Sequence, residues 1–172
     1  MILGLSLEAF VASHIVLSLV ALLSGVAVLR NFFASRTPAG ITALFLATAI
    51  ATSAGGFLFP FTRVGLGHVA GAISLVVLLP AVLAIYGGHL AGPWRWIYAT
   101  GAIAALYLDA VIAVAQTFMN IPVLRLLAPS LTAPTFLLAQ AALAALFIWL
   151  GAVAVRRFHP EHHPSHSVLR PI

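Results

Sequence analysis

The sequence predicts an all-α integral membrane protein, built as a bundle of five transmembrane helices. Of its 172 residues, 63% are hydrophobic and only 6% are charged, whereas a soluble domain carries about 25% charged residues. Five apolar runs have the roughly 20 residues that a helix needs to cross a bilayer, and most of the charged residues lie between these runs or after the last one. This composition leaves no room for a soluble domain or a nucleotide-binding fold.

Each apolar run predicts one helix, and the short links between the runs make consecutive helices antiparallel neighbours. The first run contains Glu8 and His14 and follows no basic segment, so we expect a retained helix and not a cleaved signal peptide. Pro122, within the longer link of residues 119–133, predicts a short helix on the membrane surface, with Asn120 as a possible cap. The five predicted spans are Leu7–Leu29, Ile41–Phe59, Gly67–Gly87, Trp96–Phe118 and Pro134–Val155.

The spans form one transmembrane domain, residues 1–156, and residues 157–172 are expected to form a disordered cytoplasmic tail. Prolines interrupt this tail, and it has no apolar face to bury. Its histidines, spaced closely enough to chelate a divalent metal ion, are His159, His162, His163 and His166.

Residues that the sequence lacks exclude several kinds of chemistry. The chain has no cysteine, which excludes disulfides, iron–sulfur ligation, covalent c-type haem attachment and a thiol nucleophile. It has no lysine, so a Schiff-base cofactor has no residue to bond to. We assign no catalytic residue from the sequence.

The basic residues, all of them arginines, predict the orientation in the membrane. Only Arg63 and Arg125 lie on one side of the predicted bundle, and the other six arginines lie on the opposite side. The side richer in arginine should be cytoplasmic, which places the N-terminus outside and the C-terminus inside. Because these arginines are spread between the spans, we interpret them as topology signals and expect no nucleic-acid partner. The arginines on the predicted cytoplasmic side are Arg30, Arg36, Arg95, Arg156, Arg157 and Arg170.

Polar residues within the spans concentrate in one half of the membrane. Once alternate helices are reversed, they fall in the outer half, while the inner half holds almost nothing polar. Because polar groups are expensive in hydrocarbon, we predict that they form a pocket that binds a small ligand or cofactor. The residues predicted to bound this pocket are His14, Thr52, His68, Asp109, Gln116 and Gln140. Stripes of Gly, Ala and Ser on the same helices are expected to be ordinary helix contacts.

Asp109 is the residue of this group that most needs a partner, because an acidic side chain in the hydrocarbon costs about 2.5–3.5 kcal/mol. His14, His68 and Arg63 are the candidates. By helix rise, His14 lies about 6 Å above the membrane midplane and Asp109 about 5 Å, whereas His68 lies about 14 Å above it. We therefore predict that His14 and Asp109 approach within hydrogen-bonding distance, either as a proton-carrying pair or as a tie between helices.

Three functions follow from these residues. The first is a redox role in electron transport, with haem b bound between His14 and His68 or with a transition metal held by His14, His68 and Asp109. The second is proton-coupled transport of a small solute, or sensing, through a His14–Asp109 relay. The third is an accessory subunit of a larger membrane complex or a homo-oligomer, in contact with the lipid bilayer.

Three segments resemble an uncharacterised group of bacterial polytopic inner-membrane proteins. They are the run from Thr52 to Phe61, the run from Trp94 to Tyr98, and the run from Ala105 to Phe118, which contains Asp109 and Gln116. The resemblance covers residues 50–140 and implies a helical bundle in the bacterial cytoplasmic (inner) membrane. It assigns no functional residue.

Overall fold

The computed structural model of the protein describes residues 2–59 and 65–159, and apart from one isolated bridge between Ile2 and Leu5 its regular elements are helical. In chain order these elements are α1 (Leu7–Phe33), α2 (Ala39–Gly55), the 3-10 helix η1 (Gly56–Leu58), α3 (Leu66–Val82), the π-helix η2 (Leu83–Gly87), α4 (Trp94–Asn120), α5 (Pro122–Leu127) and α6 (Pro134–Arg157).

Five of the helices are long and apolar enough to cross a membrane: α1, α2 with η1, α3 with η2, α4 and α6. Their positions confirm the five predicted long apolar helices, with differences of a few residues at the ends. They indicate an integral membrane protein. The predicted short helix in the fourth link is also confirmed as α5, with Pro122 at its first position. Asn120, however, is the last residue of α4, and Ile121 occupies the cap position of α5.

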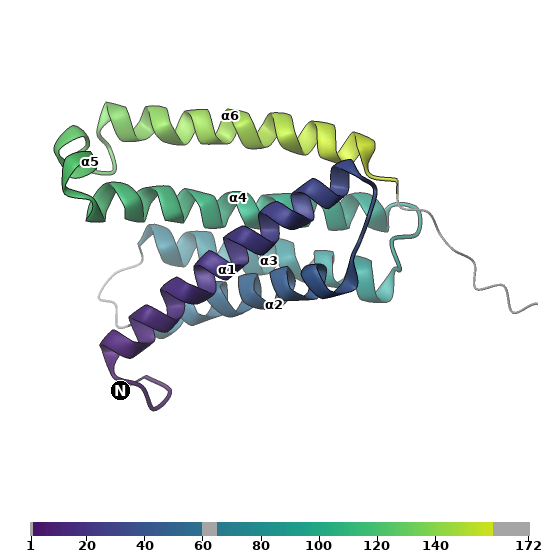
Figure 1. The fold of residues 1–172 in the computed structure, drawn as a ribbon, viewed down its shortest axis with the longest axis horizontal. Coiled ribbons are helices and arrows are strands. Elements are labelled where there is room, and N and C mark those ends of the chain that lie inside the picture. Colours follow the sequence, from purple (N-terminus) through teal and green to yellow (C-terminus); the bar gives the residue numbers. More distant parts are fainter. Residues whose placement is uncertain (1, 60–64, 160–172) are drawn as a thin grey trace, which may run out of the picture.

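Consecutive long helices run in opposite directions (Figure 1), as the short links predict. The α1–α2 turn, the α3–α4 turn and the end of α6 therefore lie at one end of the bundle, on the right in Figure 1. We call this the arginine end because five arginines lie there: Arg30, Arg36, Arg95, Arg156 and Arg157. Arg125, in α5, lies at the opposite end. Arg63 and Arg170 lie outside the described residues.

The main hydrophobic core lies toward the arginine end. It is formed by the second half of α1, the start and middle of α2, the second half of α3, the first half of α4 and the end of α6. Phe32 packs there against Tyr98 and Phe158, with ring centroids 5.4 Å and 4.7 Å away. At the opposite end, a small second cluster forms around Phe136. Residues 109–114 of α4 lie between the two clusters and are only partly buried.

Glycines allow the closest helix contacts in this core. A Cβ atom on Gly25 of α1 would lie 2.6 Å from Cδ1 of Leu106 in α4, and one on Gly101 of α4 would lie 2.8 Å from the Val77 carbonyl oxygen in α3. These contacts fix where α1 crosses α4 and where α3 packs on α4. They agree with the expectation that the small-residue stripes are helix contacts.

Candidate functional site

The predicted pocket residues lie in the half of the bundle away from the arginine end, as the sequence predicts. They come from different helices, and the structure places them in different surroundings. His14 lies on α1, Thr52 on α2, His68 on α3, Asp109 and Gln116 on α4, and Gln140 on α6.

Asp109 is the most unusual of these residues. Its side chain is partly buried, and among the described residues its buried Oδ2 atom has no hydrogen-bond partner. Thr52 Oγ1 is likewise buried without a partner within residues 2–59 and 65–159. Buried polar groups normally find partners, because leaving one unpaired costs about 1–3 kcal/mol. Binding of a proton or of a positively charged group would therefore stabilise the Asp109 carboxyl group.

The helix geometry shows which way Asp109 points. Leu106, three residues earlier and therefore on the same face of α4, contacts α1 at Gly25. Tyr107, two residues before Asp109 and so on the opposite face, packs against Phe147 of α6 with ring centroids 5.5 Å apart. Asp109 therefore faces the α1 side of α4, away from α6.

The predicted direct hydrogen bond between His14 and Asp109 is absent. The His14 ring packs against Phe59 instead, with centroids 5.0 Å apart and planes at 87°, and its Nδ1 lies 3.4 Å from where a Cβ on Gly55 would stand. The prediction assumed parallel helices of equal height, but α1 crosses the bundle obliquely (Figure 1). It meets α4 at Gly25, eleven residues or about 16 Å along the helix from His14.

His68 has a local structural role. Its Nδ1 accepts a hydrogen bond from the Gly65 backbone N–H at 3.3 Å, which caps the first turn of α3. Its ring packs edge-on against Phe57, with centroids 5.8 Å apart. This interaction satisfies a backbone donor that the start of the helix would otherwise leave free.

The predicted metal and haem sites do not fit this geometry. Within residues 2–59 and 65–159, no group of three or more His, Cys, Asp or Glu side chains lies close enough to hold a metal ion, so His14, His68 and Asp109 do not form one. A haem would need open space beside both imidazoles, yet each ring packs edge-on against a phenylalanine, Phe59 beside His14 and Phe57 beside His68. The other tail histidines, His162, His163 and His166, lie outside the described residues.

The two glutamines do not join Asp109. Gln116 is exposed, and its Oε1 accepts a hydrogen bond from Asn120 Nδ2 at 3.1 Å. Gln140 donates from Nε2 to the Val111 carbonyl oxygen at 3.1 Å, which ties α6 to α4. Val111 is two residues beyond Asp109, so this bond lies on the other side of α4. Among the predicted pocket residues, Asp109, Thr52 and Gln140 each have a buried side-chain oxygen with no hydrogen-bond partner in the described part of the chain.

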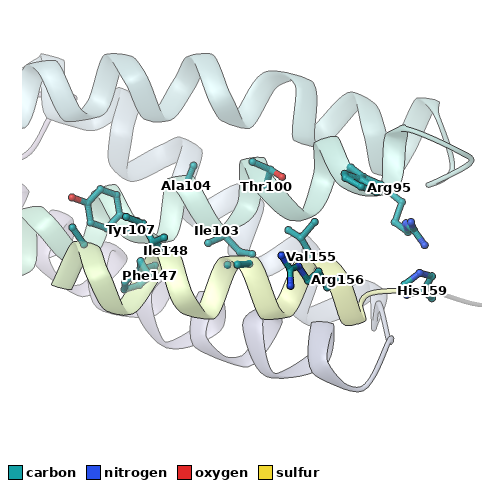
Figure 2. A pocket seen from close by; sticks show the side chains of 14 residues that line it. Arg95, Thr100, Ile103, Ala104, Tyr107, Phe147, Ile148, Val155, Arg156 and His159 are labelled. Carbon is teal, nitrogen blue, oxygen red and sulfur yellow. The ribbon is translucent and has the colours of Figure 1, made fainter. Parts of the chain in front are cut away.

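Sequence reasoning missed a cavity of about 910 Å³ between α4 and α6 at the arginine end (Figure 2). None of the six predicted pocket residues lines it. Three features of the sequence could have indicated it. Thr100 and Ala104 place small side chains on one face of α4, and Gly151 and Ala152 do the same on α6. Arg95 lies at the start of α4, at the end of the cavity.

Comparison of the chain with protein-family models, with curated proteins and with solved structures gives no match. The resemblance to bacterial inner-membrane proteins stays a prediction.

Proposed function

We propose that this protein is a proton-responsive sensor of the bacterial cytoplasmic membrane, with Asp109 as its reversible proton-binding group. The observation that carries the proposal is the buried Oδ2 atom of Asp109, which has no hydrogen-bond partner among the described residues. Intramembrane carboxyl groups of this kind are typical of proton-binding sites.

The positions of the described basic residues favour a proton as the bound cation. Five of the arginines lie at the arginine end, and Arg125 lies in α5 beyond the end of α4. His14, the predicted partner, packs against Phe59 instead. A proton neutralises a carboxylate without needing a cavity of its own, whereas a larger cation would need several ligands around it.

The orientation is part of the proposal. The arginine end is cytoplasmic by the positive-inside rule, so Asp109 lies in the half of the bundle that faces outward, with the N-terminus outside. The compact hydrophobic core at the arginine end favours binding of a proton from the outside over its passage across the membrane. These features support a sensor that responds to external acidity.

Coupled transport of a small solute is the second candidate, and one observation favours it. Pro80 lies inside α3, and the helix continues as the π-helix Leu83–Gly87 three residues later. Proline removes a backbone hydrogen bond, and π-helical turns often mark functional bends. A hinge at this point would let the arginine end open in a second conformation. In liposomes loaded with a pH-sensitive dye, transport predicts a proton flux that Asp109→Asn abolishes, whereas sensing predicts none.

A role as an accessory subunit or homo-oligomer remains the third candidate. α6 is the least buried of the five long helices. Its outward face carries Leu138, Ile148 and Trp149, which are 70%, 73% and 62% exposed. Lipid or another transmembrane helix can cover such a face equally well.

Proton uptake by the purified protein tests the proposal. We expect Asp109→Asn to bind one proton fewer than the wild-type protein when the pH of a weakly buffered sample is lowered. Glu8→Gln is the matched control, because it removes a carboxyl group that lies in the exposed first turn of α1. Identical uptake curves for Asp109→Asn and the wild-type protein, with both variants folded, would contradict the proposal.

A further inference from the structure

The cavity between α4 and α6 differs in chemistry from the Asp109 site. Figure 2 shows Arg95 and His159 at one end of it, Arg156 beside Val155, and Tyr107 and Phe147 toward the other end. One end is therefore cationic, and the remainder is lined mainly by apolar and aromatic side chains. Nothing in the proposed proton-binding role uses these residues.

The cavity exists because both helices present small side chains where they face each other. Thr100 and Ala104 lie on the α4 wall, and Gly151 and Ala152 lie on the α6 wall. Toward the other end of the cavity, Tyr107 packs against Phe147. The gap is a groove on the apolar surface of the bundle, in the zone where lipid chains would surround it.

The charges at the arginine end of the groove have no counter-ion in the described part of the chain. The only described carboxylates are Glu8, at the far end of the bundle, and Asp109, on the opposite face of α4. The Nε atom of Arg95 is buried and has no hydrogen-bond partner among the described residues. The guanidinium of Arg95 lies 5.8 Å from the Trp96 ring centroid, which holds it near the groove.

We propose that this groove is a binding site for an anionic phospholipid of the leaflet at the arginine end. The phosphate and the anionic headgroup are bound by Arg95 and Arg156, whose planar guanidinium groups match phosphate oxygens. One acyl chain lies along the apolar walls, in contact with Ile103 and Phe147. From Arg95 to Tyr107 the groove follows α4 for about 18 Å, close to the roughly 15 Å depth of one leaflet's hydrocarbon.

Charge selects this occupant over a second copy of the chain. A second copy with the same membrane orientation would bring its own arginine end beside Arg95 and Arg156, which places like charges together. A copy in the opposite orientation would violate the positive-inside rule. An anionic lipid supplies both the negative charge and the apolar chain that the groove requires.

Native mass spectrometry of the detergent-purified protein tests the headgroup contacts. The probes are phosphatidylglycerol and phosphatidylcholine with identical acyl chains. We expect selective binding of phosphatidylglycerol, weakened about fivefold by loss of either arginine and about 25-fold by Arg95→Gln with Arg156→Gln. The matched control is Arg36→Gln with Arg157→Gln, which removes the same charge from the same end but alters no residue that lines the groove.

Filling the groove tests the acyl-chain contacts. Ala152→Phe places a ring in the groove and should reduce phosphatidylglycerol binding, while Ala145→Phe, at an exposed position of α6 outside the groove, should not. Equal binding of the two lipids, or equal losses in the two double-arginine variants, would overturn the site. A lipid-free dimer that Ala152→Phe disrupts would show instead that a second copy covers the groove.

Discussion

The side chain of Ser35 connects the turn after α1 to the end of α6 at Arg157. Its hydroxyl donates a hydrogen bond to the Arg157 carbonyl oxygen at 2.8 Å and accepts one from the His159 backbone N–H at 3.1 Å. Carbonyl groups at the end of a helix lack partners within it. The two hydrogen bonds of Ser35 therefore add to the packing of Phe32 on Phe158 in connecting the first and last long helices at the arginine end.

Replacing this serine should loosen that end of the bundle. We expect Ser35→Ala to lower the free energy of unfolding by about 1–2 kcal/mol, because two hydrogen bonds are lost. Unfolding in mixed micelles with increasing sodium dodecyl sulfate measures the change. Ser13→Ala is the control, since the Ser13 hydroxyl bonds only to the Ala9 carbonyl in its own helix. Equal stability of the two variants would show that the connection contributes nothing.

The contact of Gly101 with α3 should tolerate no side chain. A Cβ on Gly101 would lie 2.8 Å from a backbone carbonyl oxygen, so Gly101→Ala requires α3 and α4 to separate. We expect a loss of about 1–3 kcal/mol in the same unfolding assay. Gly67→Ala, where nothing lies within 4 Å of the added Cβ, should keep or raise stability because alanine favours helix. A neutral Gly101→Ala would mean that the two helices are less closely packed than described.

We expect Gln140 to act as a structural hydrogen bond between α6 and α4, and not as part of a binding site. Gln140→Leu removes the bond to the Val111 carbonyl, but it also removes the buried Oε1 atom, which has no partner among the described residues. Interhelical hydrogen bonds in membranes average about 0.6 kcal/mol, so we expect a change in unfolding free energy below about 1 kcal/mol. Proton uptake should remain that of the wild-type protein. A variant that folds normally but loses proton uptake would show that Gln140 is part of the proton-binding site.

The orientation can be checked by reporter fusions. A reporter fused after Ile172 should be cytoplasmic, and one inserted after Ala128, between α5 and α6, should be on the outside, because the arginine end faces the cytoplasm. Alkaline phosphatase activity at the inserted site and green fluorescence at the C-terminal site are the expected readouts. The reverse pattern would invert the bundle and place Asp109 in the cytoplasmic half.

The fold was predictable because helix length and apolar composition together determine a transmembrane span. The five long helices follow from these two properties, and the short helix follows from Pro122 in the link before the last long helix. The position of the six predicted pocket residues away from the arginine end was also predictable. Consecutive helices are antiparallel, so the place of a residue along its helix gives its distance from that end.

Contacts between particular side chains were not predictable, because they depend on how each helix tilts and rotates. His14 and Asp109 have similar calculated depths, yet the oblique course of α1 leaves His14 beside Phe59. His68 caps its own helix through Gly65, a local contact that depth does not reveal. The groove between α4 and α6 depends on which small residues face each other, such as Ala104 and Gly151.

Infrared difference spectroscopy of the protein in liposomes tests the central claim most directly, since it detects the carbonyl stretch of a protonated carboxyl group. We predict that a shift to lower external pH produces such a band, that Asp109→Asn removes it, that Asp109→Glu moves it and that Glu8→Gln leaves it unchanged. If the band is absent from the wild-type protein, or persists in a folded Asp109→Asn protein, Asp109 is not the proton-binding group and the proposed function is wrong.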